Sequence, residues 1–163
     1  MGTVAIVDYG VGNLKSVANA LSYLGCSSCI TADPAELERA DAIILPGVGA
    51  FPDAADRLRS GGLNQHVLAQ GQKKPVLGIC LGMQLLLEQG REVRPCPGLG
   101  VIRGTVDRIP TQSKLPHIGW NSLRFFHHSP LFRGLDEGAY VYFVHSFSAQ
   151  DTDPAQVIAA TDY

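Results

Sequence analysis

The sequence predicts an α/β fold, in which a mostly parallel sheet carries helices on both faces and gains added antiparallel strands. Short apolar runs alternate with segments whose apolar residues recur at helical spacing. Short loops join these segments, as in right-handed βαβ units on a parallel sheet. After Gly90, strand-like segments follow one another without intervening helices, which indicates antiparallel or mixed strands.

The first half of the chain supplies the parallel strands and the helices between them. Four apolar runs have the length of buried strands: Thr3–Val7, Ser28–Thr31, Ala42–Leu45 and Pro75–Ile79. Helices are predicted over Leu14–Leu24, from Pro34 onward, over Asp53–Leu68 with a break at Gly61-Gly62, and over Leu81–Gln89. Asp33-Pro34-Ala35-Glu36 combines an N-cap, a first-turn proline and a capping-box glutamate, which starts the second helix.

The second half contains three further strand-like segments. They are Gly100–Ile109, Asn121–Phe126 and Tyr140–Ser148. The chain has 163 residues and contains no internal repeat, low-complexity tract or interdomain linker. We therefore expect a single domain over residues 1–163.

Composition excludes several classes of function. The net charge of −2 and a pI near 6.2 provide no basic surface for nucleic acid or an anionic membrane. No apolar run reaches membrane-spanning length, and the N-terminus lacks the basic start and cleavage site of a signal peptide. We expect a cytoplasmic protein whose four cysteines are thiols.

The sequence predicts neither a cofactor nor a metal. The turns at Gly10–Ser16 and Gly47–Pro52 follow strands but lack the third glycine of a dinucleotide-binding loop. Cys26-Ser27-Ser28-Cys29 has the spacing of a zinc or redox pair, but no second ligand pair accompanies it. This segment lies between a helix end and a strand, whereas a redox pair opens a helix. Packing is therefore the favoured role of both cysteines.

Gly78-Ile79-Cys80-Leu81-Gly82 lies where a predicted buried strand turns into a helix. This is the pattern of a nucleophile elbow, in which small residues two positions either side permit a sharp turn. The turn lifts the sulfur of Cys80 above the carboxyl edge of the sheet, where α/β folds bind ligands. The following helix points its N-terminus at the sulfur and favours the thiolate, the nucleophile of acyl transfer. The alternative is a buried cysteine in a tight turn.

Two backbone donors are available near Cys80 to hold an oxyanion. The N–H of Leu81 follows the nucleophile directly. The loop Leu45-Pro46-Gly47-Val48-Gly49 follows a neighbouring strand at the same edge of the sheet and carries little side-chain bulk. It is a candidate for the second donor, although its glycines could serve backbone geometry alone.

Five segments together carry a family resemblance: Asp8–Asn13, Pro46–Gly49, Gly78–Gln84, Pro116–Asn121 and Tyr142–Phe147. The second and third resemble the triad class of glutamine amidotransferases. The other three narrow the likeness to glutaminase subunits of imidazole glycerol phosphate synthase, which serve histidine biosynthesis. The resemblance runs over the whole chain in order and implies a flavodoxin-like glutamine amidotransferase fold.

The resemblance implies glutamine hydrolysis by acyl transfer. Cys80 attacks the side-chain amide of L-glutamine, ammonia leaves, and water hydrolyses the thioester to glutamate. The N–H groups of Val48 and Leu81 hold the oxyanion. Gly47 and Gln84 help to bind glutamine.

By the same resemblance, the backbone of His145, Ser146 and Phe147 meets the amino-acid end of the substrate. The implied partner is a TIM-barrel cyclase subunit in a heterodimer, which receives the ammonia and makes imidazole glycerol phosphate and AICAR. Asn13 and Trp120 are expected at the interface with this partner. The alternative for Trp120 is a place in the core.

The family carries its catalytic base in a His-Pro-Glu segment near the C-terminus. None of the five histidines here is followed two positions later by an acidic residue, and the chain ends with Val157–Tyr163 after an apolar strand. We therefore expect a C-terminally incomplete domain that is inactive as given, because the base histidine and its glutamate are absent. An inactive scaffold that only binds the cyclase, and His145 as a substitute base, are the alternatives. Another cysteine hydrolase on the same elbow is a further alternative, which Gln84 and the Gly119-Trp120-Asn121 segment disfavour.

Overall fold

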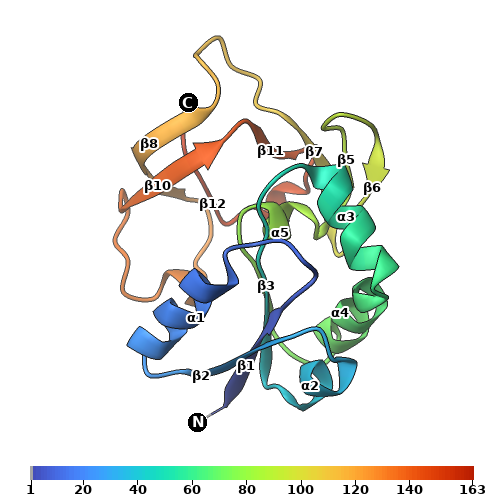
Figure 1. Ribbon diagram of the computed structural model, residues 1–163. Helices are drawn as coiled ribbons and strands as arrows, with labels where there is room; N and C mark the ends of the chain where they lie inside the picture. Colours follow the sequence, from blue (N-terminus) through green and yellow to red (C-terminus); the bar gives the residue numbers. More distant parts are fainter. Residues whose placement is uncertain (1) are drawn as a thin grey trace.

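The computed structural model describes residues 2–163 and is organised around a four-stranded sheet (Figure 1). The strand order is β2-β1-β3-β4, and all three pairings are parallel. The strands are β1 (Thr3–Val7), β2 (Ser27–Thr31), β3 (Ala42–Leu45) and β4 (Val76–Gly78). The predicted parallel sheet is confirmed. The order is that of the flavodoxin-like topology.

Helices cover both faces of this sheet, as predicted. They are α1 (Leu14–Tyr23), α2 (Pro34–Arg39), α3 (Phe51–Ser60) and α4 (Leu63–Gly71). Figure 1 shows α1 on one side of β1 and β3, and the other three helices on the opposite side. The main core forms on the latter side, where Leu37, Leu58 and Val67 of the helices meet Val7 and Leu45 of the strands. All five are almost fully buried.

A second sheet, with mixed parallel and antiparallel pairing, follows α5 (Leu81–Gln84) in the chain. Its strand order is β11-β7-β5-β6. The strands are β5 (Leu87–Gly90), β6 (Cys96–Pro97), β7 (Ile102–Arg108) and β11 (Phe147–Gln150). β5 pairs with β7 in parallel, while the other two pairings are antiparallel. The expected antiparallel additions are therefore present.

The prediction of a long helix over Leu81–Gln89 is wrong, because α5 ends at Gln84 and a strand begins at Leu87. Backbone N–H groups of a later segment occupy the carbonyls that a helix would use: Leu99 donates to the carbonyl of Leu85 at 2.8 Å. The run of leucines is buried as expected. Burial alone does not separate a strand from a helix in a short apolar run.

A two-stranded hairpin lies above the carboxyl edge of the parallel sheet (Figure 1). β8 (His117–Ser122) and β10 (Tyr140–His145) pair antiparallel, with Trp120 opposite Tyr142 and His117 opposite His145. One face of this hairpin is apolar and exposed: Ile118, Trp120, Tyr140, Tyr142 and Val144.

Of the three predicted late strands, Gly100–Ile109 is the single strand β7, and the other two are divided in the structure. Tyr140–Ser148 breaks at Ser146 into β10 and β11, which belong to different sheets. Asn121–Phe126 covers the end of β8 and the short strand β9 (Arg124–Phe125), which pairs with β12 (Ala159–Ala160). Two short 3-10 helices, η1 (Pro130–Phe132) and η2 (Pro154–Gln156), complete the described elements. Across residues 2–163, no helix combines the length and apolar character needed to cross a membrane.

Candidate active site

Cys80 occupies a strained turn between β4 and α5. Its backbone has φ of 54° and ψ of −119°, a conformation that residues with a side chain rarely adopt. Such strain costs about 1–3 kcal/mol and persists where the surrounding structure enforces it. The side chain is exposed rather than packed. The alternative of a buried structural cysteine at this position is therefore excluded.

The glycines on either side of Cys80 are required by close backbone contacts. A Cβ on Gly78 would lie 2.4 Å from the Cα of Met83. A Cβ on Gly82 would lie 1.8 Å from the carbonyl oxygen of Leu45. Both separations are far below a van der Waals contact. The small residues of the motif thus permit the sharp turn and its packing against β3.

The loop after β3 lies directly against this turn. A Cβ on Gly47 would be 2.6 Å from the backbone N of Gly82, so backbone meets backbone here. Within residues 2–163, neither the N–H of Val48 nor that of Leu81 has a hydrogen-bond acceptor. Two unpaired backbone donors therefore flank the cysteine, as an oxyanion site requires.

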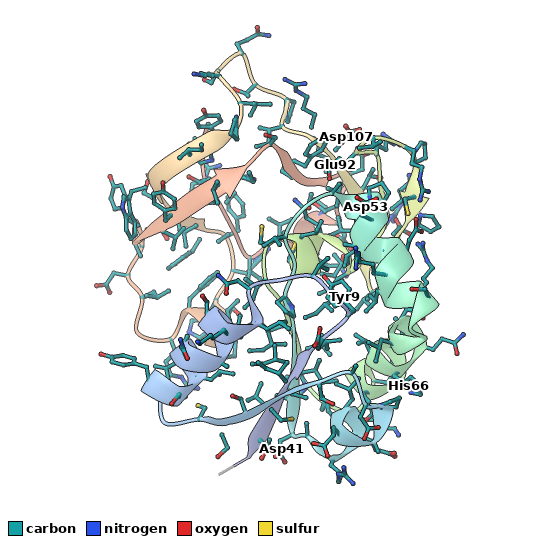
Figure 2. All side chains as sticks on the ribbon, in the orientation of Figure 1. Tyr9, Asp41, Asp53, His66, Glu92 and Asp107 are labelled. Carbon is teal, nitrogen blue, oxygen red and sulfur yellow. The ribbon has the colours of Figure 1, made fainter. Side chains whose placement is uncertain are left out.

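Tyr9 anchors this loop from below (Figure 2). Its hydroxyl donates a 2.6 Å hydrogen bond to the carbonyl of Pro46, and both residues are buried. Burial raises the pKa of the Tyr9 phenol far above its ordinary value, so the hydroxyl keeps its proton. The Pro46 carbonyl immediately precedes Gly47 and Val48, whose conformation it helps to fix.

We expect Tyr9→Phe to destabilise the protein by about 1–3 kcal/mol, because it leaves the buried Pro46 carbonyl without a donor. Equilibrium unfolding in urea measures this loss. Tyr23→Phe is the control, since the Tyr23 side chain is 92% exposed and that substitution should leave the unfolding midpoint unchanged. Equal midpoints for Tyr9→Phe and the wild type would contradict the anchoring role.

A cavity of about 350 Å³ opens at Cys80. Its lining comprises Val48, Gly49, Cys80, Leu81, Gln84, Glu92, Val144, His145, Ser146 and Phe147. Every residue that we predicted for catalysis, oxyanion binding and substrate binding is in this lining, except Gly47, which is buried. A larger cavity of about 480 Å³ in the loop from Phe125 to Leu135 contains no thiol.

Glu92 is a residue of this cavity that the sequence did not single out. Its Oε2 accepts a 2.8 Å hydrogen bond from the backbone N–H of Phe51, which places the carboxylate at the start of α3. Glu92 is the only acidic residue among those lining the cavity. Figure 2 shows it near the N-terminal end of α3. It comes from the turn between β5 and β6, which carries no motif.

His145 is not placed to act as a base for Cys80. Its Nδ1 lies 3.1 Å from the carbonyl oxygen of Phe147, and its Nε2 lies 3.0 Å from Nδ1 of His117. Both ring nitrogens are therefore occupied. In the part of the chain that the structure describes, no side chain forms a hydrogen bond with the sulfur of Cys80.

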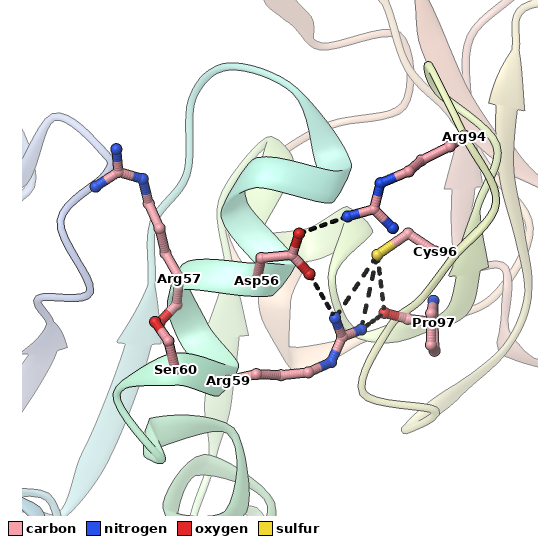
Figure 3. Close-up of polar contacts among 7 residues, drawn as sticks. All are labelled: Asp56, Arg57, Arg59, Ser60, Arg94, Cys96 and Pro97. Carbon is pink, nitrogen blue, oxygen red and sulfur yellow. Dashed lines mark hydrogen bonds and ion pairs between the residues drawn. The ribbon is translucent and has the colours of Figure 1, made fainter.

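Cys96 is a packing residue (Figure 3). It is almost fully buried, and its sulfur lies 3.7 Å from Nη1 of Arg59. Arg59 also donates to the Pro97 carbonyl and pairs with Asp56, which in turn pairs with Arg94. This cluster ties α3 to β6 and leaves the thiol inaccessible.

The packing role predicted for the Cys26–Cys29 pair is wrong for Cys26. Cys26 is exposed and Cys29 is half-buried on β2. Burial and the carboxylate of Glu36 raise the pKa of the Cys29 thiol, which disfavours its nucleophilic form. Among the described residues, no three or more His, Cys, Asp or Glu side chains are grouped as metal ligands.

The two predicted interface residues both face solvent. Asn13 caps α1 through its side chain, which accepts a 3.3 Å hydrogen bond from the N–H of Ser16. Trp120 is 68% exposed, and its ring lies edge-on against that of Tyr142, with ring centroids 5.7 Å apart. A core role for Trp120 is therefore excluded.

Comparison with known proteins gives consistent matches over nearly the whole chain. The family model described as glutamine amidotransferase class-I matches residues 5–163. The imidazole glycerol phosphate synthase subunit HisH of Oceanobacillus iheyensis is 46% identical over 161 residues, which are 98% of this chain and 80% of the relative. The protein of the same name from Geobacillus kaustophilus is 47% identical over 167 residues, covering 98% of this chain and 79% of the relative.

Solved structures with lower sequence identity share the fold. A glutamine amidotransferase crystal structure superimposes with a TM-score of 0.75 at 20% identity, covering 97% of this chain and 79% of the other. PurLQS from Thermotoga maritima gives a TM-score of 0.70 at 20% identity, covering 99% and 75%.

Proposed function

The chain belongs to the class-I glutamine amidotransferases, and from that premise we propose that it is the glutaminase subunit of an imidazole glycerol phosphate synthase. One observation carries the assignment of the site: the exposed Cys80, held in a strained turn, opens into a cavity between two unpaired backbone donors. This arrangement suits attack by sulfur on a neutral amide whose oxygen becomes negatively charged.

The proposed reaction has two steps. The thiolate of Cys80 attacks the side-chain amide carbon of L-glutamine, and the carbonyl oxygen takes up negative charge between the N–H groups of Val48 and Leu81. The carbon–nitrogen bond then breaks, the nitrogen leaves as ammonia after gaining a proton, and a thioester remains on the sulfur. Water hydrolyses the thioester, which releases glutamate and restores the thiol.

The cavity also offers groups for the amino-acid end of glutamine. The carboxylate of Glu92 can pair with the substrate α-ammonium group. His145, Ser146 and Phe147 also line the cavity, and we expect their backbone to meet the α-carboxylate. Gln84 is almost fully buried and donates through Nε2 to the Phe147 carbonyl at 3.2 Å, so its amide fixes this backbone.

Selective labelling of Cys80 tests this function. A substoichiometric diazoketone analogue of L-glutamine is expected to modify Cys80 before Cys26, the other exposed thiol, because only Cys80 lies in a glutamine-sized cavity. Peptide mapping by mass spectrometry measures the ratio, and added L-glutamine should slow the reaction. Cys80→Ser is the matched control. Equal labelling of Cys26 and Cys80, or no protection by L-glutamine, would reject the site.

We propose that the exposed apolar face of the β8–β10 hairpin binds a TIM-barrel cyclase subunit. This face consists of the five residues Ile118, Trp120, Tyr140, Tyr142 and Val144, all more than half exposed. Clustered exposed aromatic residues are typical of interfaces and rare on monomers. The relatives' name, a synthase subunit, fits an assembly of this kind.

Trp120→Ala is expected to weaken co-purification with the cyclase subunit of a close relative by about 10-fold or more, because a central tryptophan commonly contributes about 2 kcal/mol to an interface. Circular dichroism should remain that of the wild type, since most of the Trp120 side chain is exposed. Tyr23→Ala is the control, as Tyr23 is an exposed aromatic residue on α1, outside the hairpin. Unchanged cyclase affinity in Trp120→Ala would exclude this face from the interface.

A further inference from the structure

A single backbone carbonyl joins two side chains at the glutamine site. The oxygen of Phe147 accepts from Nε2 of Gln84 at 3.2 Å and lies 3.1 Å from Nδ1 of His145. A carbonyl oxygen can only accept, so Nδ1 of His145 carries a proton. A His145 ring with that single proton presents a lone pair at Nε2.

That lone pair faces a second histidine, and the pairing determines where the second ring holds its proton. Nδ1 of His117 lies 3.0 Å from Nε2 of His145, so His117 must donate from Nδ1. Its Nε2 then accepts from the side-chain amide of Asn121, at 3.5 Å. The same amide nitrogen donates to the carbonyl of Asp162 at 2.8 Å.

The opposite proton arrangement is blocked at Asn121. A His117 ring protonated at Nε2 would face the amide N–H of Asn121, and two donors would meet. Rotating the amide would break the bond to the Asp162 carbonyl and a 2.9 Å bond that Asn121 Oδ1 accepts from the N–H of Ser122. The hydrogen-bond partners thus select one tautomer for both rings.

The surroundings of His117 keep its ring neutral and fixed. It is 3% exposed and lies between two aromatic rings, with centroids 4.7 Å from Phe143 and 3.9 Å from Tyr163. Burial, and secondarily the neighbouring His145, lower the pKa of His117. The reaction proposed at Cys80 assigns no role to the His117 ring.

We propose that His117 and His145 are positioning residues of the glutamine site, two neutral rings protonated at Nδ1 that hold the Phe147 carbonyl and its partner Gln84 in place for substrate. This inference rests on the proposed glutaminase function and adds to it a role for His117, which lies outside the cavity lining. We call this hydrogen-bond chain, from Asn121 through His117 and His145 to the Phe147 carbonyl, the relay. It orients the backbone that receives glutamine, and it transfers no proton to or from the substrate.

The tautomers can be read directly by NMR. Long-range ¹H–¹⁵N correlation on the folded protein near neutral pH should give a protonated Nδ1 and an unprotonated Nε2 for both His117 and His145. Exposed His66 is an internal reference for a ring without this constraint. A protonated Nε2 on either His117 or His145 would overturn the relay without touching the assignment of Cys80.

Protection of Cys80 by L-glutamine tests the functional effect. Iodoacetamide modifies the Cys80 thiol, and the glutamine concentration that halves this rate reports affinity. His117→Phe keeps the stacked ring and removes the donor, so this concentration should rise roughly fivefold, the effect of one net hydrogen bond. The rate without glutamine should stay unchanged. His117→Asn, which places an amide N–H near the position of Nδ1, should recover most of the affinity.

The controls separate the two proposals. His66→Phe makes the same substitution on an exposed helix position and should behave as wild type. If L-glutamine protects the wild type and His117→Phe equally, the relay is wrong and the glutaminase site stands. If L-glutamine does not protect the wild type, the proposed function itself fails, and the relay fails with it. The tautomer measurement needs only the wild type, so it decides the relay even if a variant does not fold.

Discussion

A polypeptide of residues 1–163 is expected to leave L-glutamine essentially unhydrolysed, and extension through the His-Pro-Glu segment of a close relative should raise glutamate production by at least about 10²-fold. The amide is a poor electrophile, and its nitrogen must gain a proton as it leaves. Val48 and Leu81 can hold an oxyanion, but neither activates a thiol. His145, the histidine lining the cavity, has both ring nitrogens engaged.

Glutamate release by both polypeptides, each with and without the cyclase subunit, measures this difference. The extended form carrying Cys80→Ala is the control, because groups that act together in catalysis lose activity together. Activity in the 163-residue form that disappears in His145→Ala would make His145 the base and contradict the hydrogen-bond arrangement described above.

Gly82→Ala is expected to prevent stable folding, with a loss exceeding about 4 kcal/mol. The added methyl carbon would lie 1.8 Å from the carbonyl oxygen of Leu45, and that oxygen already accepts a 3.0 Å hydrogen bond from the N–H of Ile79. Removing this clash would require β3 and the turn at Cys80 to separate, because the Leu45 carbonyl and the Gly82 Cα both belong to the backbone. Among the glycines of the described residues, this is the shortest separation that a new Cβ would meet.

Far-ultraviolet circular dichroism and urea unfolding of the purified variant measure this effect. Gly61→Ala is the matched control, since Gly61 has ordinary backbone angles and its nearest neighbour would lie 3.7 Å from a new Cβ. That variant should unfold within about 0.5 kcal/mol of the wild type. A Gly82→Ala protein with wild-type stability would show that the turn relaxes easily, and the strain assigned to Cys80 would then be wrong.

The parallel sheet and the sharp turn at Cys80 were predictable from sequence because both depend on local patterns. A buried parallel strand is a short apolar run, and β1 and β3 match their predicted limits. The elbow requires small residues at fixed spacing around Cys80, and the contacts of Gly78 and Gly82 give the physical reason.

The remaining features depend on contacts between distant segments. The run Leu85–Leu87 suits a buried helix or a buried strand equally. Its backbone is not helical because N–H groups of the segment from Gly98 to Ile102 donate to its carbonyls. His117 and His145 are 28 residues apart and meet only through the register of β8 and β10. Glu92 reaches the cavity from a turn without a motif.

The backbone of Cys80 also sets a balance between stability and activity. Glycine adopts φ near 54° without a side-chain penalty, so the fold would be more stable with glycine at the position where the proposed glutaminase chemistry needs a thiol. Selection for thermal stability alone would favour glycine over cysteine at this position. Stabilised variants of such a domain therefore need to be screened for turnover as well as for melting temperature.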